Sequence, residues 1–224
     1  MHIPDGFLDV KACAATGAAA AVALGYALSR SEGALNAKLV PKIALTGAFV
    51  FAAQMLNFPV AGATSGHFLG GAMAAILFGP RIAVILMAAV LIVQALVFQD
   101  GGLTALGANI LCTGVIGSYV GYGVYRAGGM LLRGRGSKAV VFFSAWCSIV
   151  AAAAGVALLL AWSGTIPLGL ALRAMVGWHS LIGIGEGLIT MLAVSYLTER
   201  QAFPARPARG AVSEPALAEG TVLR

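Results

Sequence analysis

The chain alternates long apolar runs with short polar stretches over its 224 residues. Seven runs can be marked, at roughly 12–28, 42–58, 65–79, 82–98, 103–125, 139–162 and 176–197. Each approaches the roughly 20 residues that a helix needs to cross the hydrocarbon core of a bilayer. The third run is short and begins with Gly66-His67, so we expect an irregular outer end there. The pattern predicts an all-α polytopic membrane protein with seven transmembrane helices.

Composition agrees with a single membrane domain. Hydrophobic residues make up 60% of the chain and charged residues only 10%, whereas soluble domains carry about 25% charge. We expect one membrane domain over 1–198. The remainder, 199–224, is rich in Pro, Ala and Gly without an apolar period, and is typical of a flexible cytoplasmic tail.

Basic residues predict the orientation. If the chain crosses the membrane seven times, twelve of them share one side: Arg30, Lys38, Lys42, Arg81, Arg126, Arg133, Arg135, Lys138, Arg200, Arg206, Arg209 and Arg224. Only Lys11 and Arg173 fall on the other side. The positive-inside rule then places the N-terminus outside and the C-terminus in the cytoplasm. The net charge of +6 therefore reports orientation and gives no reason to expect a nucleic-acid partner.

All three histidines fall at or near the outer boundary in this topology. His2 lies in the outer N-terminal segment, His67 in the loop before the third run, and His179 at the entry to the seventh. The topology used only Lys and Arg, so this convergence supports it independently. A histidine at position two can also chelate a metal, because the Met1 amine, the His2 amide and the His2 ring close two fused rings. One further imidazole completes a planar four-nitrogen site of the kind that suits Ni(II) or Cu(II).

The N-terminal segment carries signals for folding back into the helices. Pro4 stiffens it, Asp5-Gly6 favours a turn, and Phe7 and Leu8 are anchors. We expect the mature chain to start at Met1, because a secretory signal would need a positive start and a cleavage site. The alternative is that His2 is a surface residue on a frayed end.

Several polar residues are candidates for support around the metal. His67 is the candidate fourth ligand, with a simple helix cap as its alternative, and Thr64 and Ser65 are placed to hydrogen-bond its ring. Asp100 and Asn109 are the polar groups best placed to join the outer site.

The seventh run contributes two more candidates. His179 either makes a supporting hydrogen bond or joins Trp178 in the interfacial aromatic belt. Glu186 follows two turns later on the same face, where an acid at membrane depth is costly. It is suited to neutralise metal charge, to accept a proton, or to join helices by a hydrogen bond.

Small residues at four-residue spacing mark a candidate contact with a partner protein. Ala44, Ala48 and Ala52 form such a stripe in the second run, and stripes of this kind let helices approach closely. Ordinary packing within the bundle is the alternative.

The chain resembles the CbiM/NikM family, the substrate-binding membrane subunits of energy-coupling factor (ECF) transporters for nickel and cobalt. The resemblance rests on the stretches MHIPDGFL (1–8), GATSGHFLG (62–70), DGGLTALGAN (100–109) and HSLIGIGEG (179–187). It implies seven helices with the N-terminus inserted into the bundle. It also implies a metal held by Met1, His2 and His67, with no organic cofactor.

The resemblance further implies partners and a location. The partners are a transmembrane coupling protein, cytoplasmic ATPase subunits and a small accessory membrane subunit, in a bacterial or archaeal cytoplasmic membrane. The chain has no Walker motif, so it is not expected to be an enzyme, and ATP must be hydrolysed by another chain. The start HIPDG favours nickel, with cobalt for cobalamin synthesis a close second. Two other classes stay open: a stand-alone metal channel or secondary carrier, and a membrane metalloenzyme using His67, His179 and Glu186.

Overall fold

The computed structural model describes residues 1–56, 58–60, 64–132 and 137–200, with only the backbone described for 34, 58–60, 64, 65 and 137. The expected tail therefore lies outside the described residues, apart from its first two positions.

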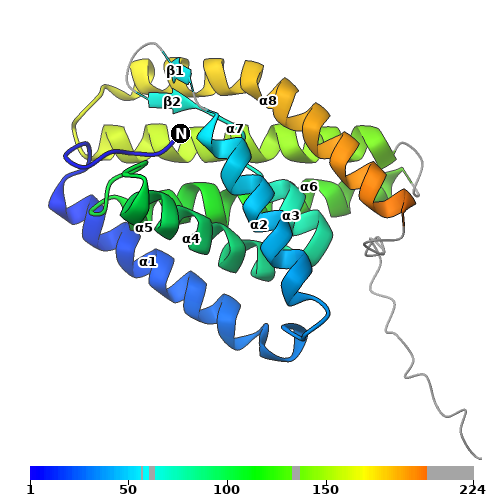
Figure 1. Ribbon diagram of the computed structural model, residues 1–224. Helices are drawn as coiled ribbons and strands as arrows, with labels where there is room; N and C mark the ends of the chain where they lie inside the picture. Colours follow the sequence, from blue (N-terminus) through cyan, green and yellow to red (C-terminus); the bar gives the residue numbers. More distant parts are fainter. Residues whose placement is uncertain (57, 61–63, 133–136, 201–224) are drawn as a thin grey trace, which may run out of the picture.

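The described part is helical except for one short hairpin (Figure 1). Its long helices are α1 (Val10–Ser29), α2 (Val40–Met55), α4 (Pro80–Val97), α7 (Ser137–Trp162) and α8 (Leu168–Glu199). Shorter elements are the 3-10 turn η1 (Glu32–Ala34), α3 (Gly71–Phe78), and the antiparallel strands β1 (Phe58–Val60) and β2 (Thr64–Gly66). A further rod runs from Leu106 to Leu131 as α5 (Leu106–Asn109), the π-helical η2 (Ile110–Ile116) and α6 (Gly117–Leu131). Each of the seven predicted runs thus contains one helical rod.

Hydropathy separates these rods into two groups. Four helices are long and apolar enough to cross a membrane, namely α1, α4, α7 and α8, and α2 is a shorter apolar helix. The third predicted run differs from expectation, since only its eight residues 71–78 are helical. Eight residues rise about 12 Å, well short of the roughly 30 Å hydrocarbon core.

The short helix α3 is enclosed by its neighbours. All eight of its residues are buried, against α4, α6, α7 and α8. The backbone between β2 and Gly70 is non-helical, and Gly70 itself is left-handed, so the start of this run is irregular as expected. Non-helical backbone of this kind is tolerated in a membrane protein where protein surrounds it. The segment that carries His67 is therefore fixed inside the assembly.

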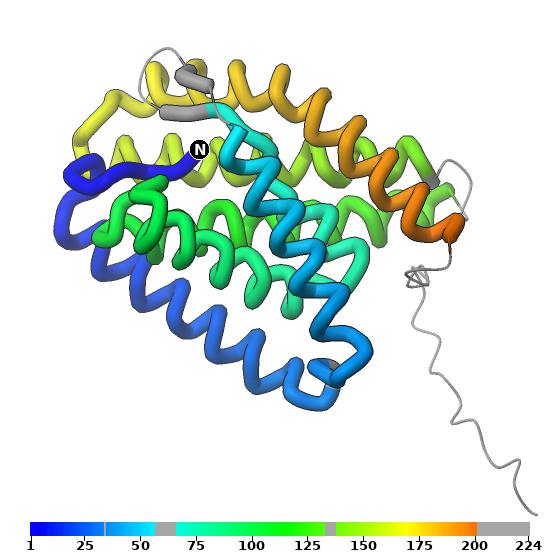
Figure 2. The backbone as a smooth tube through the Cα atoms, in the orientation of Figure 1, coloured from blue at the N-terminus to red at the C-terminus, as the bar shows by residue number. Residues whose placement is uncertain are grey.

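The first nine residues turn back into the protein. Gly6 has φ +83°, a left-handed conformation that reverses the chain before Asp9 caps α1 by accepting from the Ala12 amide. Figure 2 shows this dark-blue segment leading from the start of α1 toward the middle of the helix assembly. The prediction of an inserted N-terminus is confirmed by the burial of Met1 and Ile3.

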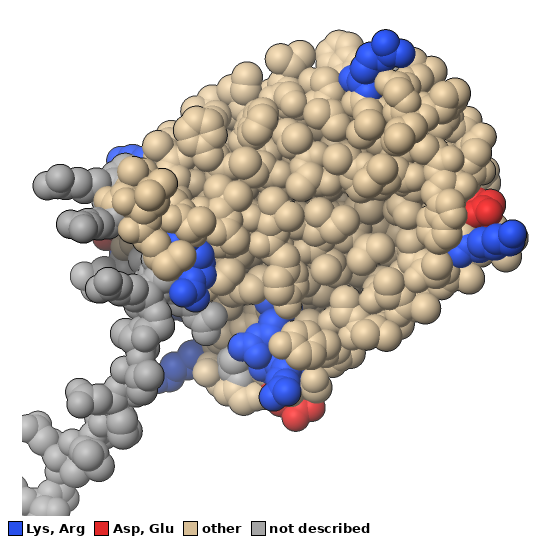
Figure 3. All heavy atoms as spheres, turned by 180° about the vertical axis from the view of Figure 1, so that it is seen from behind, with Lys and Arg blue, Asp and Glu red and all other residues tan. Residues whose placement is uncertain are grey.

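Charge is concentrated at the ends of the molecule. Figure 3 shows tan surface over the sides of the helices, with blue atoms gathered near the end from which the grey tail leaves. On the face that Figure 3 shows, the sides of the helices are therefore almost free of charged residues, as a bilayer requires.

Candidate metal site

The N-terminal residue is part of the protein core. Met1 is fully buried and belongs to one cluster with Leu69 before α3, Ile149 in α7 and Met175 in α8. Burial of this kind brings the terminal amine among residues from distant parts of the chain. The N-terminus therefore occupies one defined place.

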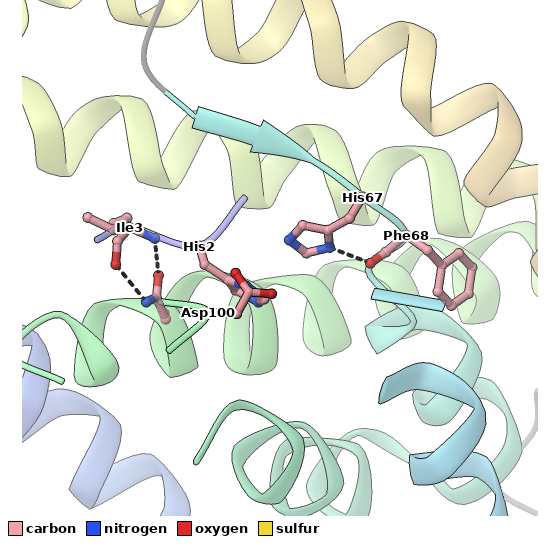
Figure 4. A network of polar contacts seen from close by, with 6 residues as sticks. His2, Ile3, His67, Phe68 and Asp100 are labelled. Atoms are coloured by element: carbon pink, nitrogen blue, oxygen red, sulfur yellow. Dashed lines mark hydrogen bonds and ion pairs between the residues drawn. The ribbon is translucent and has the colours of Figure 1, made fainter. Parts of the chain in front are cut away.

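A side-chain clamp holds the third residue. The Asn109 side chain accepts a hydrogen bond from the Ile3 amide at 2.8 Å and donates one to the Ile3 carbonyl at 3.1 Å (Figure 4). The Gly102 amide also donates to the Ile3 carbonyl, at 2.9 Å. Both main-chain polar groups of Ile3 are thus satisfied as they would be in a sheet. Since Ile3 directly follows His2, the clamp also limits where the His2 backbone can lie.

A second clamp acts two residues later. The Asp5 carboxylate accepts hydrogen bonds from the amides of Leu103 (3.1 Å) and Thr104 (2.8 Å) and from the Thr104 hydroxyl. These bonds hold the pKa of Asp5 below its ordinary value, the Thr104 hydroxyl being the largest cause. Thr104 was not predicted from the sequence, because no sequence pattern links residue 5 with residue 104.

The two outer histidines lie against each other. The ring centroids of His2 and His67 are 4.5 Å apart and their planes are inclined by 38° (Figure 4). His67 Nδ1 lies 2.6 Å from the carbonyl oxygen of Phe68, which places the ring proton on Nδ1. The other nitrogen, Nε2, is buried without a hydrogen-bond partner. His67 thus presents a buried lone pair, the form in which an imidazole binds metal.

Burial favours the unprotonated form of the first two residues. It lowers the pKa of the Met1 amine from 8.0 to about 4 and lowers the pKa of His2. Near neutral pH burial therefore favours the neutral amine and the neutral His2 ring, the forms that bind metal.

Asp100 provides the negative charge of the site. Its Oδ1 lies 3.0 Å from His2 Nδ1, and this contact is the largest cause that lowers the pKa of Asp100. Nδ1 is also the ring nitrogen that closes a six-membered chelate with the His2 amide. A divalent metal held there has Asp100 beside it to balance its charge.

Side chains alone do not make up a complete set of metal ligands in the described part of the chain. Within the described part of the chain, no three or more His, Cys, Asp or Glu side chains gather closely enough to hold a metal ion. Two imidazoles alone leave a four-coordinate ion short of ligands. The Met1 amine and the His2 amide are the candidates for the other two ligands of a planar nitrogen site.

The other residues predicted to support the metal site do not all lie beside His2 and His67. The side chains of Thr64 and Ser65 lie outside the described residues, so their expected hydrogen bond to the His67 ring stays a prediction. His179 is fully buried with Nδ1 against the Met175 carbonyl at 2.7 Å. Trp178 beside it is 45% exposed, so the two side chains lie on different faces of α8. Glu186 contacts the backbone after His67 and not the histidines themselves.

The small-residue stripe of α2 is on the surface. Ala44, Ala48 and Ala52 are all exposed, and the first two border a shallow apolar groove between α2 and α4. The buried face of this helix is formed instead by Thr46, Val50 and Gln54. The stripe is therefore not explained by packing within the bundle.

Comparison with known proteins decides the family. Residues 2–203 match the family model described as the cobalt uptake substrate-specific transmembrane region, CbiM. The chain belongs to the CbiM family. CbiM proteins are transport proteins, and with its apolar helices this member is an integral membrane protein.

Among the relatives of this CbiM-family chain, some are named for nickel transport and others for cobalt transport. A putative fused nickel transport protein NikMN of Archaeoglobus fulgidus is 40% identical over 88% of this chain, which spans 65% of that relative. A putative cobalt transport protein CbiM of Methanococcus voltae is 37% identical over 60% of each chain. The crystal structure of a truncated transition metal transporter superposes with a TM-score of 0.84 at 35% identity, covering 89% of this chain and 99% of the other.

Proposed function

We propose that this chain is the metal-binding membrane subunit of an ATP-driven importer of the ECF type. It captures Ni(II) at the outer face through the Met1 amine, the His2 amide, His2 Nδ1 and His67 Nε2. The observation that carries the proposal is the stacking of His2 on His67 beside a buried terminal amine, with the lone pair of His67 unpartnered. The nickel and cobalt names of the relatives support the class of cargo.

The choice of nickel rests on the donor set. Four nitrogens in a plane, one of them a deprotonated amide, suit Ni(II) better than Co(II). Cu(II) binds such a site at least as well, so metal supply and the shape of the cavity complete the selection. Co(II) is the second cargo that we propose.

The topology follows from charge and burial together. We propose seven passes, with the short helix α3 completing its pass through the non-helical residues 64–70. The N-terminus then faces the outside, and the tail lies in the cytoplasm of a bacterial or archaeal cell. The metal enters from outside and loses its water shell as the N-terminal segment and the His67 loop enclose it.

Release of the metal requires other chains. The match to the CbiM family supports a transmembrane coupling protein, cytoplasmic ATPase subunits and a small accessory membrane subunit as partners. The exposed stripe Ala44, Ala48 and Ala52 is the proposed surface for the coupling protein, since it lets a second helix approach closely. Activity without those chains would favour a stand-alone carrier, and metal-dependent turnover of a substrate would favour an enzyme.

A matched titration tests the chelate. Ni(II) and Co(II) are titrated into purified protein that starts at Met1 and into protein extended by one N-terminal residue. We expect the extension to weaken Ni(II) binding by about 100-fold or more, because it turns the amine ligand into a buried amide. His67→Ala is expected to weaken binding as well, and Trp178→Phe, an outward-facing residue, serves as the control. Equal binding by the native and extended chains would refute the chelate.

A further inference from the structure

Two buried polar side chains converge on the backbone just after His67. Glu186 of α8 accepts hydrogen bonds from the amides of Leu69 at 2.6 Å and Gly70 at 2.9 Å, one on each carboxylate oxygen. Gln54 of α2 donates to the Leu69 carbonyl at 2.6 Å. Both side chains are almost completely buried. Two helices thus hold the same short loop by its main chain.

These contacts differ from ordinary attraction between helices. Residues 67–70 lie between β2 and α3, where neither a helix nor a strand ladder satisfies the backbone. An acid within a membrane domain is costly, and here both of its oxygens are used on that loop. The loop is tightly packed at its end, because Gly70 has φ +82° and a Cβ there would lie 2.7 Å from Val50. Glu186 therefore binds a backbone whose shape depends on this glycine.

One peptide group connects Glu186 to the metal ligand. The carbonyl that faces His67 Nδ1 belongs to Phe68, and the amide that Glu186 binds belongs to Leu69. These two groups are the C=O and N–H of the same peptide bond, which is planar and rigid. Glu186 and the His67 ring thus bind opposite ends of one rigid peptide group.

We propose that Glu186 is the positioning residue of the metal site. Through the Phe68–Leu69 peptide group it fixes the His67 ring with Nε2 toward the chelate of Met1 and His2. It also strengthens His67 as a donor, because hydrogen bonds in a chain polarise one another and a ligand is more basic when its other nitrogen donates. A shift of α8 that carries Glu186 away would turn the same peptide group and loosen the ligand. This inference rests on the proposed function.

Two substitutions on one face of α8 test it. Glu186→Gln keeps the shape of the side chain but puts an NH2 donor where one carboxylate oxygen accepts, so one of the two backbone amides loses its acceptor. Thr190→Val is the matched control, one turn further along α8, since its fully buried hydroxyl has no hydrogen-bond partner. Glu186→Asp keeps the charge with a shorter reach, and it replaces Glu186→Gln if that variant fails to fold.

Three measurements are made on the full-length protein in detergent. Amide hydrogen exchange around Leu69 and Gly70 is followed without metal, Ni(II) affinity is titrated, and the visible absorption of the Ni(II) complex reports its coordination geometry. We expect Glu186→Gln to speed the exchange, to weaken Ni(II) binding by about 10- to 100-fold and to shift the absorption band. Glu186→Asp gives a smaller loss, and Thr190→Val behaves as the unsubstituted chain.

The outcomes separate this inference from the proposed function. Unchanged exchange in Glu186→Gln would show that the carboxylate does not hold the loop, and faster exchange with unchanged affinity and spectrum would show that it does not position the ligand. Either result overturns the inference and leaves the chelate standing. An unsubstituted chain that binds neither Ni(II) nor Co(II) overturns the proposed function, and the positioning role falls with it.

Discussion

The side-chain amide of Asn109 pairs with both main-chain polar groups of Ile3, although 106 residues separate them in sequence. It satisfies the amide and the carbonyl of Ile3, as the backbone of a neighbouring strand would. Because Ile3 follows His2, these bonds also restrain the His2 backbone. Asn109 lies at the end of α5, where the π-helical segment η2 begins. A π-helical turn inside an α-helix is frequent at functional sites.

Removing this clamp should weaken metal binding. In Asn109→Leu the Ile3 amide loses its acceptor and is left unsatisfied in a buried place, at a cost of about 1–3 kcal/mol to the docked segment. We expect Ni(II) affinity to fall by about 10- to 100-fold in a calorimetric titration. Ser118→Ala is the control, since that buried hydroxyl has no partner, and it should leave the affinity unchanged. Equal affinities for the two variants would contradict a role for the clamp.

The approach of the outer loop to the N-terminal segment leaves no room for a side chain at Gly102. A Cβ there would lie 2.4 Å from the Asp5 nitrogen and 2.7 Å from the Pro4 carbonyl carbon, both of them backbone atoms. Gly102→Ala should displace the segment and abolish tight Ni(II) binding while the helices stay folded, as circular dichroism would show. Gly25→Ala in α1 meets no atom within 4 Å and should retain full binding. Tight binding by Gly102→Ala would show that the segment adapts.

Proton release on metal binding should be small. The pKa of the docked amine is about 4 against 8.0 for a free terminus, so between these values the undocked chain holds a proton that the docked chain lacks. Docking, and with it metal affinity, therefore strengthens as the pH rises from about 4 to about 8. At pH 7 the docked chain has only its amide proton to lose, so we expect the release of about one proton per Ni(II).

Calorimetry in buffers of different ionisation enthalpy counts these protons. A free Met-His-Ile peptide is the control, and it should release about two, because its amine is still largely protonated at pH 7. Release of two protons by the full chain would mean that its terminus is undocked before the metal arrives.

A bulky substitution in the exposed stripe of α2 should reduce metal transport without changing metal binding. Ala48→Phe places a ring on a surface that we propose for the coupling protein, and it touches none of the metal ligands. We expect metal uptake in cells that carry all subunits to fall at least about tenfold, with Ni(II) affinity of the purified chain unchanged. Ala21→Phe, on the exposed surface of α1, is the control for a bulky lipid-facing ring. Normal uptake with Ala48→Phe would move the partner surface elsewhere.

The sequence predicted what depends on local patterns. Apolar periodicity located the seven rods, and a chelate made by two consecutive residues, Met1 and His2, needs no knowledge of the fold. His67 could be proposed because few histidines exist in the chain and the charge pattern brought them to one side. Its contact with His2 is a finding of the structure.

The length of α3 and the hydrogen bonds that hold the site could not be predicted, because they depend on contacts between residues distant in sequence. The length of α3 was missed because a helix buried by protein is as apolar as one that faces lipid, so hydropathy cannot tell a short enclosed helix from a crossing one. The pairs Asp5 with Thr104 and Glu186 with Leu69 join residues about 100 positions apart. Their side chains give no sign in sequence of which backbone amides they accept.

The burial of Met1 restricts which chemical groups its nitrogen can carry. An acyl group on the Met1 nitrogen, such as an acetyl group, would make it an amide with no lone pair to give to a metal. The same group would have to fit into a core that leaves Met1 fully buried. Under the proposed function, a chain therefore binds the metal only while its Met1 nitrogen carries no such group.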